Sequence, residues 1–471
     1  MMFKPCLQLL AICLGLFAAL SGCTLGPAYQ RPAMVVPPVY REAAPWKEAT
    51  PGDALDKGAW WRVFADPMLD DLQERARSAN QDLQAAVARV DQARAAARIS
   101  ENALYPRIDL DPSAQRGRSN GTTATVLRVP FDLGYEIDLW GRVRRTVEAG
   151  TAEYEASRAE MENVLLTLQA EVARNYFSLR SFDAQLDLLR RTIELRSKNL
   201  QLVTSLFDNG QVGRLDVARA ETELANAQAE TAALKRRRTA TEHALAVLVG
   251  APVANFDLPL RPPDLEVEPP PLAAGLPSAL LERRPDIAAA ERQMMAANAR
   301  IGIARAAFFP AVSLTGSAGY ASDELSGLFN WDSRIWSLGP FVTLPVFDAG
   351  RNRAQLAQAE AAWQEAVARY RQQVLSAFRE VEDALADIRI LAEQAEAQQR
   401  ALTSSRQEAE LSGKRYRAGL VSYLEVVVSE RTALNTELLA NQVLEQRFQA
   451  SVSLIKALGG GWQEVVTTVP E

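Results

Sequence analysis

Cysteine and histidine are almost absent from this chain of 471 residues. The three cysteines are Cys6, Cys13 and Cys23, and the one histidine is His243. Residues 24–471 therefore cannot form a disulfide framework or a zinc site with cysteine ligands. A single histidine excludes a metal centre with several histidine ligands and argues against most acid–base enzymes. We expect no catalytic residue, no metal and no cofactor, and we place His243 on a helix face.

The chain also lacks an excess of basic residues over acidic ones. Lys and Arg number 52 against 58 Asp and Glu residues, which gives a formal net charge of −6. This balance argues against a general nucleic-acid-binding protein, because such proteins carry a basic face. Near the N-terminus, Lys4 precedes an uncharged and mostly apolar run of 14 residues at 7–20. That length is typical of a signal-peptide core and is short for a membrane-spanning helix.

The end of this apolar run predicts a lipid anchor. Leu20-Ser21-Gly22-Cys23 resembles a bacterial lipobox, in which the cysteine is acylated and becomes the first residue of the mature chain. Thr24 follows, rather than aspartate, as in lipoproteins that are forwarded to the outer membrane. We expect residues 1–22 to be a lipoprotein signal peptide and Cys23 to carry covalent lipid such as palmitate, which anchors without spanning. An ordinary signal peptide with a chance cysteine is the alternative.

Two proline-rich segments divide the remaining chain. Residues 23–60 contain six prolines and are expected to form an extended N-terminal anchor segment. Residues 257–277 contain seven prolines and are expected to form a linker with an equatorial region. The segments on either side of this linker, 61–256 and 278–460, are two copies of one unit, and a C-terminal tail follows at 461–471.

The two copies correspond at constant offsets. Residues 80–83 and 104–106 resemble 284–287 and 308–310 at an offset of 204. The second copy then has five extra residues, and the offset becomes 209 for Gly141-Arg142 with Gly350-Arg351, Gly210 with Gly419, Asp216 with Glu425, Glu221 with Glu430, and Gly250 with Gly459. A constant offset over so long a stretch predicts two structural repeats with the same order of elements.

Each repeat contains a long stretch without helix breakers. Residues 351–412 have neither proline nor glycine, and apolar residues in both repeats recur at a mean spacing of 3.5. That spacing predicts a left-handed coiled coil. Glycine-containing turns near Gly210 and Gly419 end the long helices, and the chain then returns. We expect helical hairpins at 142–249 and 351–458.

A shorter alternating pattern predicts one β-hairpin in each repeat, at about 106–140 and 310–349. Apolar residues alternate with polar or charged ones from Leu127 to Leu139, and a similar alternation runs from Trp336 to Val346. Strands of about ten residues with one apolar face match a transmembrane barrel. Four strands cannot close a barrel, and lipid does not tolerate an open edge, so several chains would have to share one. The alternative is a half-buried sheet in a soluble coiled-coil protein.

These motifs jointly resemble the outer-membrane efflux lipoproteins of the TolC-like superfamily, in the branch that serves resistance-nodulation-division pumps. The resemblance extends over nearly the whole mature chain. It is carried by Gly26-Pro27-Ala28-Tyr29-Gln30-Arg31-Pro32, Trp60-Trp61, Asp66-Pro67, Asp138-Leu139-Trp140-Gly141-Arg142, Arg283-Arg284-Pro285-Asp286-Ile287, Ile301-Gly302, Phe309-Pro310, Ser313-Leu314-Thr315-Gly316, Leu344-Pro345, Phe347-Asp348-Ala349-Gly350-Arg351 and Tyr416-Arg417-Ala418-Gly419.

The resemblance implies a membrane α+β fold, with two tandem repeats of long coiled-coil helices and a β-hairpin each. Three copies would form a homotrimer with one 12-stranded β-barrel in the outer membrane of a Gram-negative bacterium and an α-helical tunnel in the periplasm. It further implies a passive, gated exit duct for drugs or other toxic compounds. Its partners would be a periplasmic adaptor (membrane fusion) protein and an inner-membrane resistance-nodulation-division transporter. The alternatives are the duct of a type I secretion system and a soluble periplasmic coiled-coil protein. The sequence does not name the exported substrate.

The gate and the adaptor contact are expected at the helix turns. The gate candidates lie just past the turns and are Asp216, Arg219, Leu424, Glu425, Val428, Glu430 and Arg431. Rings of carboxylates favour cations. In related proteins an aspartate stands at the position of Val428, so this chain either moves its acidic gate to Glu425 or uses Leu424 and Val428 as an apolar constriction. The adaptor-contact candidates are Gly210, Gly213, Arg214, Gly419, Leu420 and Ser422. For all of them the alternatives are a solvated helix face or a plain helix cap.

Overall fold

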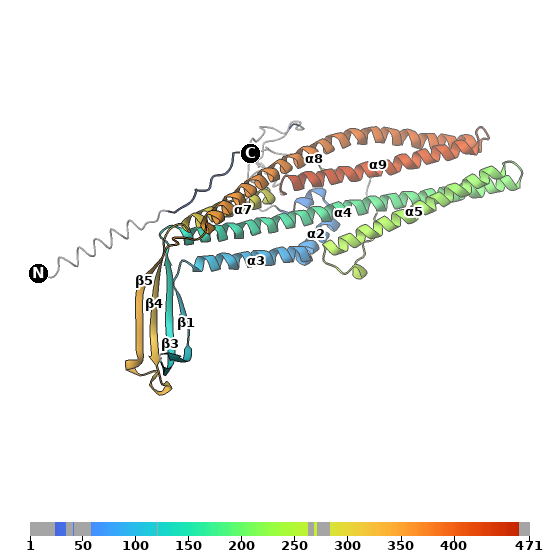
Figure 1. Ribbon diagram of the computed structural model, residues 1–471. Coiled ribbons are helices and arrows are strands. Elements are labelled where there is room, and N and C mark those ends of the chain that lie inside the picture. The colour runs from blue at the N-terminus through green and yellow to red at the C-terminus, as the bar shows by residue number, and fades with distance from the viewer. Residues whose placement is uncertain are drawn as a thin grey trace, which may run out of the picture. The chain divides into compact units, whose positions relative to one another are not determined.

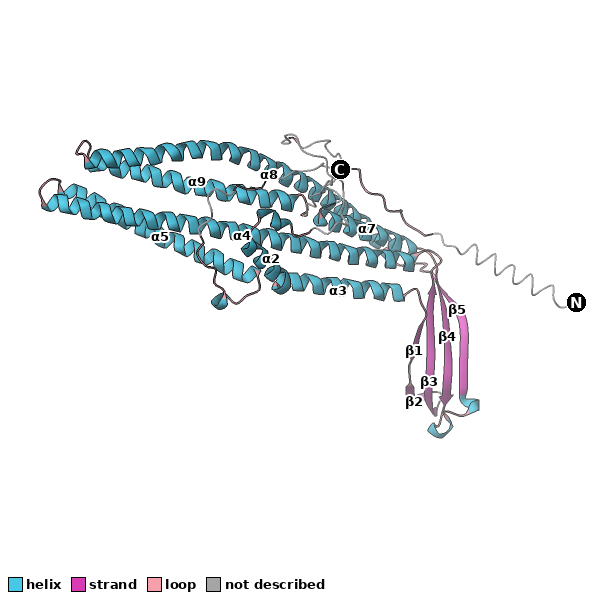
Figure 2. Ribbon diagram, turned by 180° about the vertical axis from the view of Figure 1, so that it is seen from behind, coloured by secondary structure: helices cyan, strands magenta, loops and turns pink. Residues whose placement is uncertain are grey.

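The computed structural model describes residues 24–33, 41, 58–119, 121–261, 268–270 and 283–460. The expected signal peptide at 1–22, the expected acylation site at Cys23 and the expected tail at 461–471 lie outside these residues, as do parts of the N-terminal segment and of the linker. The described chain is mostly helical, and its few strands form one sheet (Figures 1 and 2). None of its helices combines the length and the apolar character needed to cross a membrane.

Three helices of the first repeat have counterparts of equal length in the second repeat. Helix α3 (Gln81–Asn102) and helix α7 (Pro285–Ala306) have 22 residues each and begin 204 residues apart. The long helices have 67 residues each and the returning helices have 35, with starts 209 residues apart: α4 (Arg142–Asp208) with α8 (Arg351–Arg417), and α5 (Arg214–Leu248) with α9 (Tyr423–Ala457). These are the two offsets found in the sequence.

Helices that precede the strands were not expected. Helix α2 (Pro67–Ala79) begins at Asp66, whose side chain accepts a hydrogen bond of 2.9 Å from the backbone N–H of Met68. Proline at the first helical position and an aspartate cap before it are common helix starts. Short 3₁₀ helices lie at Trp60–Phe64, Val253–Asn255, Leu325–Gly327 and Trp331–Ser333.

The chain folds into two compact units that do not coincide with the sequence repeats. Of the described residues, the first unit contains 24–33, 87–160 and 286–373, and the second contains the rest. Each unit therefore takes segments from both repeats. The 67-residue helices α4 and α8 each contribute residues to both units.

The first unit holds the sheet. Its strands are β1 (Arg107–Leu110), β2 (Ser113–Ser119), β3 (Thr122–Ile137), β4 (Ala311–Ser322) and β5 (Arg334–Thr343). The order is β1-β3-β4-β5, with β2 also paired to β3, and every pairing is antiparallel. Strands β3 and β4 come from different repeats and pair from Leu127↔Ser322 to Ile137↔Val312. The two hairpins thus form one sheet, with β5 at one edge and β1 and β2 at the other.

The strand ends differ from the expected ones at prolines. Strand β3 has 16 residues rather than about ten, and the strand paired with it is interrupted between β1 and β2 at Pro112. Strand β5 ends at Thr343, so the predicted alternation through Val346 does not continue as a strand. Proline lacks the N–H that a ladder needs and restricts the residue before it, which explains the stop before Pro345.

Residues 24–33, here called the N-terminal strap, are fixed against helices of the first unit. The N–H of Leu25 donates to the carbonyl of Trp140 at 3.1 Å. Gly26 has φ +103°, and a Cβ there would lie 2.6 Å from the Cα of Gly302. Further along, Arg31 forms a two-pronged ion pair with Glu291, with both N···O distances 2.6 Å. Gly26 and Arg31 of the motif 26–32 therefore have packing roles.

The second unit contains an aromatic core. Phe64, Phe177 and Phe448 come from three distant segments, and the rings of Phe177 and Phe448 stack at 4.6 Å between centroids. Trp60 and Trp61 belong to the same buried cluster, together with residues of α2, α4, α5 and α9. The Trp60-Trp61 motif is thus part of the core of this unit.

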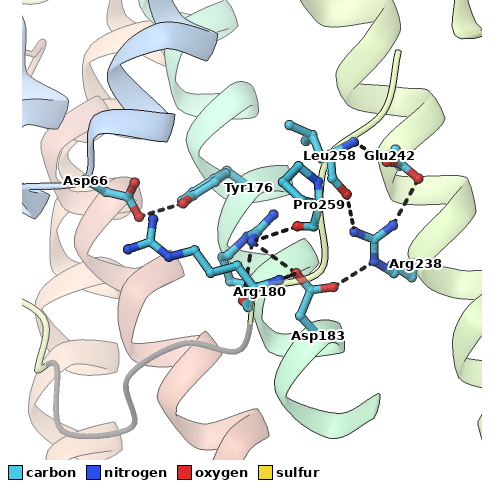
Figure 3. A network of polar contacts seen from close by, with 9 residues as sticks. Asp66, Tyr176, Arg180, Asp183, Arg238, Glu242, Leu258 and Pro259 are labelled. Carbon is cyan, nitrogen blue, oxygen red and sulfur yellow. Dashed lines mark hydrogen bonds and ion pairs between the residues drawn. The ribbon is translucent and has the colours of Figure 1, made fainter. Parts of the chain in front are cut away.

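A buried polar network lies beside this core (Figure 3). The carboxylate of Asp183 has no exposed surface and lies 2.7 Å from Nε of Arg238 and 3.1 Å from Nη1 of Arg180. Arg238 also donates to the carbonyl of Leu258 at 2.6 Å, and the N–H of Leu258 donates to Glu242 at 2.7 Å. The start of the Pro-rich linker is therefore fixed to α4 and α5.

We predict that Asp183→Ala destabilises the second unit by about 3–5 kcal/mol, because it leaves two buried guanidinium groups without their shared carboxylate. Chemical denaturation of the purified protein, followed by far-UV circular dichroism, measures this. Asp187→Ala is the matched control on the same helix, since Asp187 pairs with the exposed Arg190 and Arg191. Its loss should cost less than about 1 kcal/mol. Equal effects of the two variants would contradict the assigned role of Asp183.

Candidate functional site at the helix turns

The two turns that end the long helices have the same backbone conformation. Gly210 has φ +72°, its N–H donates to the carbonyl of Phe207 at 2.8 Å, and the next N–H, that of Gln211, donates to Leu206 at 2.9 Å. Gly419 has the same φ, and the corresponding hydrogen bonds are both 2.9 Å. This pair of bonds is the Schellman cap, which needs a left-handed residue that glycine adopts without strain.

The turns pack against each other in the second unit. We call residues 205–216 tip 1 and residues 414–425 tip 2. One hydrophobic cluster joins the tips to the adjoining helix ends. Tyr423 of tip 2 is buried in it, Phe207 and Val212 of tip 1 and Tyr416 of tip 2 pack against it, and its other buried members are Val203, Val217, Ala220, Val426 and Val427. The rings of Tyr416 and Tyr423 lie 5.5 Å apart within tip 2. The two hairpins therefore end together rather than separately.

A buried ion pair lies below the tips. Arg196 on α4 is 3.1 Å from the carboxylate of Glu223 on α5, and both side chains are nearly buried. Arg196 also donates to the backbone carbonyl of Glu223 at 2.6 Å. Neither residue was among the predicted site residues. The available signal was that Arg196 occupies the next core position of the apolar series that ends at Ile193.

Glu430 lies inside the hairpin pair rather than on an open face. The side-chain amide of Asn199 donates to Glu430 at 2.9 Å, across from α4 to α9. Burial raises the pKa of Glu430 above its ordinary value, and the bond from Asn199 partly opposes this rise. Burial, followed by the nearby Glu430 carboxylate, raises the pKa of Tyr423 to about 12. Glu430 thus belongs to a polar layer with Arg196 and Glu223.

The other gate candidates fall into two groups. Leu424, Val428 and Arg431 are exposed and lie at spacings of four and three on α9, so they share one helix face. The charged candidates nearest the turns have partners within their own hairpin: Glu425 lies 3.1 Å from Arg415, and Asp216 lies 3.3 Å from Arg219.

The six adaptor-contact candidates are exposed, and two of them also have a structural role. Gly210 and Gly419 form the caps described above. Gly213 and Ser422 precede the first residues of α5 and α9, and neither provides a side-chain hydrogen bond to its helix. Arg214 is exposed, 4.0 Å from Glu221, and Leu420 is 70% exposed.

The described residues contain no group of three or more His, Cys, Asp or Glu side chains arranged to hold a metal ion. His243 lies on the exposed face of α5, which confirms its expected place on a helix.

We predict that Glu430→Gln stabilises the tips at neutral pH. A carboxyl whose pKa is raised by folding favours the folded state only when protonated, so this contribution is complete at acid pH and is lost as the pH rises through the raised pKa. Glutamine mimics the protonated form. Amide hydrogen exchange of residues 423–434 should therefore be slower than in the wild type at pH 7, by up to about tenfold, and equal near pH 4.

Glu221→Gln is the control for this experiment, because Glu221 occupies the same repeat position as Glu430 but is exposed. It should leave exchange unchanged at either pH. Faster exchange in Glu430→Gln at neutral pH would contradict the burial argument.

Comparison with known proteins agrees with this architecture over almost the whole chain. A family model described as outer membrane efflux protein matches residues 72–251 and 276–460. The toluene efflux pump outer membrane protein TtgF of Pseudomonas putida is 36% identical over 471 residues, covering 96% of this chain and 97% of the relative. The cation efflux system protein CusC of Escherichia coli O6:H1 is 35% identical over 471 residues, covering 98% of this chain and 100% of the relative.

A solved structure supports the same assignment. The crystal structure of the open state of the Neisseria gonorrhoeae MtrE outer membrane channel has a TM-score of 0.83 and 33% identity, covering 93% of this chain and 98% of that chain. The predicted resemblance and the predicted outer-membrane location in a Gram-negative bacterium are confirmed. This chain belongs to the outer membrane efflux protein family, whose TolC-like members are the outer-membrane channels of efflux pumps.

Proposed function

We propose that three copies of this chain form the exit duct of a tripartite efflux pump. The observation that carries the proposal is the single sheet with two open edges, to which both repeats contribute. Exposed strand edges demand a partner, and in lipid they are not tolerated at all. Each chain supplies four strand positions, with β1 and β2 sharing one of them, so three chains joined edge to edge supply a barrel of twelve.

The side chains of β5 support placing this sheet in a membrane. Trp336, Leu338 and Val342 lie on alternating positions and are all more than half exposed. Large apolar side chains exposed on one face of a strand are costly in water and favourable in lipid. We therefore assign this face of β5 to the outside of the barrel.

We assign a covalent lipid anchor to Cys23. The next residue, Thr24, packs against Gly141, where an added Cβ would lie 2.8 Å from Thr24 Cγ2. Leu25 bonds to Trp140, three residues after the end of β3. The strap thus begins where the sheet ends, which is where acyl chains would meet the membrane surface.

The cargo would be chosen by the transporter that fills the duct. One relative is named for toluene and another for cations, although both match nearly the whole of this chain. We propose an inner-membrane transporter of the resistance-nodulation-division class and a periplasmic adaptor as partners, with the adaptor bound at tips 1 and 2.

We place the closed constriction at the exposed face of α9 that contains Leu424, Val428 and Arg431. Three copies of this face would form stacked rings, two apolar and one basic. The ion pair between Glu425 and Arg415 would hold α9 against α8 in the closed state.

The architecture is tested by the oligomer that the chain forms. We expect a trimer in mild detergent, detected by native mass spectrometry, and co-purification of an adaptor and a transporter. Gly319→Ala should reduce the trimer fraction strongly, because a Cβ there would lie 2.1 Å from the carbonyl oxygen of Val129 on β3. Gly339→Ala is the matched control, since a Cβ at Gly339 meets nothing within 4 Å. A monomeric wild type would refute the proposed duct.

The gate is tested by conductance. Glu425→Ala removes the pair with Arg415, so we expect a higher single-channel conductance in planar bilayers and greater sensitivity of cells to large antibiotics. Glu393→Ala is the control, because it removes a similar exposed pair on α8, with Arg389, far from the tip. No change with Glu425→Ala in either measurement would remove Glu425 from the gate.

A further inference from the structure

The two tips present opposite charge on the same backbone. Asp208 is the last residue of α4 and Arg417 is the last residue of α8, so the two stand at equivalent positions of the repeats, 209 residues apart. Tip 1 contains two aspartates and one arginine, whereas tip 2 contains one lysine, two arginines and one glutamate. Their formal charges are therefore −1 and +2.

An acidic residue at the position of Asp208 does not stabilise the end of α4. The C-terminal end of a helix carries a partial negative charge and favours cations. Helix α8 follows this rule with Lys414, Arg415 and Arg417 in its last turn, whereas the last turn of α4 has no basic residue. A residue that breaks such a local rule on an exposed turn is a candidate for a role outside its own helix.

Within the described residues, the other charges of the tips are paired and these two are not. Lys414 pairs with Glu410, Arg415 with Glu425, and Asp216 with Arg219. Arg417 donates only to the backbone carbonyl of Gly413, at 3.2 Å. Asp208 is exposed and forms no ion pair with the described residues. One uncompensated carboxylate and one uncompensated guanidinium therefore remain.

Each tip that carries a free charge also contains an exposed leucine. Leu215 in tip 1 is 62% exposed, and Leu420 in tip 2 is 70% exposed. An apolar contact beside a single charge is the composition of a protein-docking surface, with the leucine providing burial and the charge providing selectivity.

We propose that the periplasmic partner docks on the tips through two chemically different elements: a basic one that pairs with Asp208 and an acidic one that pairs with Arg417, each with an apolar contact to Leu215 or Leu420. This inference rests on the proposed function. It adds a defined alignment of the partner on the tips. If the partner were rotated from one tip to the other, its basic element would face Arg417 and its acidic element would face Asp208, and like charges would repel.

The experiment uses the adaptor that co-purifies with the wild-type trimer, then purified by itself. Its affinity for immobilised full-length trimers is measured at low and high salt. Asp208→Arg and Arg417→Asp should each weaken binding by about tenfold or more at low salt. The wild-type affinity should fall as salt rises, and the variants should depend on salt less.

Two controls make the same changes of charge away from the tips. Glu230→Arg on α5 and Arg400→Asp on α8 alter exposed residues that are 16 and 17 positions from the tip-side ends of their helices, or roughly 25 Å along the axis. Both should bind the adaptor as the wild type does. Asp208→Asn separates docking from folding, because it should weaken binding while the thermal midpoint stays the same or rises.

The outcomes distinguish this inference from the proposed function. Binding that is equal for the wild type and both tip reversals overturns the charge pairing alone, as does equal weakening by the distant controls. If no adaptor binds the wild type, the proposed function and this inference both fail. Salt-sensitive association of the trimers with one another, abolished by either reversal, would show instead that the tips join two copies of this channel.

Discussion

Pairing of β3 with β4 is the constraint on which the rest of the molecule depends. A two-stranded hairpin is marginally stable alone, and each repeat provides only one. The ladder from Leu127↔Ser322 to Ile137↔Val312 joins the two into a single sheet. Gly319 makes this possible at its closest point, since even a methyl group there would collide with the backbone of β3. The same pairing brings the starts of α4 and α8 into one compact unit, so the long helices begin from a common base.

The backbone is conserved between the two repeats in a way that the side chains are not. The backbone is preserved: α4 and α8 have equal lengths, and both end in glycine caps with the same φ. The side chains at equivalent positions diverge, as with Glu221, which is exposed, and Glu430, which is half-buried against Asn199. A duplicated scaffold can therefore carry two different surfaces without a change of architecture, and function is found in the differences between the repeats.

The sequence predicts the regular parts of this fold well, because they depend on local chemistry. Long helices follow from the absence of proline and glycine, and the turns at Gly210 and Gly419 follow from glycine alone. Helices α2 and α7 were missed although Asp66-Pro67 and Pro285-Asp286 are recognisable helix starts. The network around Asp183 could not be predicted, because Arg238 and Leu258 reach it only after α4, α5 and the linker have packed. The ion pair of Glu425 with Arg415 and the burial of Glu430 against Asn199 could not be predicted either. Helix spacing tells which residues share a face, but it does not tell which neighbouring helix covers that face.

Packing also differs within the second unit, between the aromatic core and the region of the tips. The aromatic core with Trp60, Phe177 and Phe448 is extensive and lies beside buried ion pairs. The cluster beneath the tips is smaller, consists mostly of valine and alanine with Tyr423, and is interrupted by the polar layer of Arg196 and Glu430. Regions with fewer buried apolar contacts open at a lower free-energy cost. Movement of the tips would disturb this small cluster and leave the aromatic core intact, which is the property that the proposed gate at the tips requires.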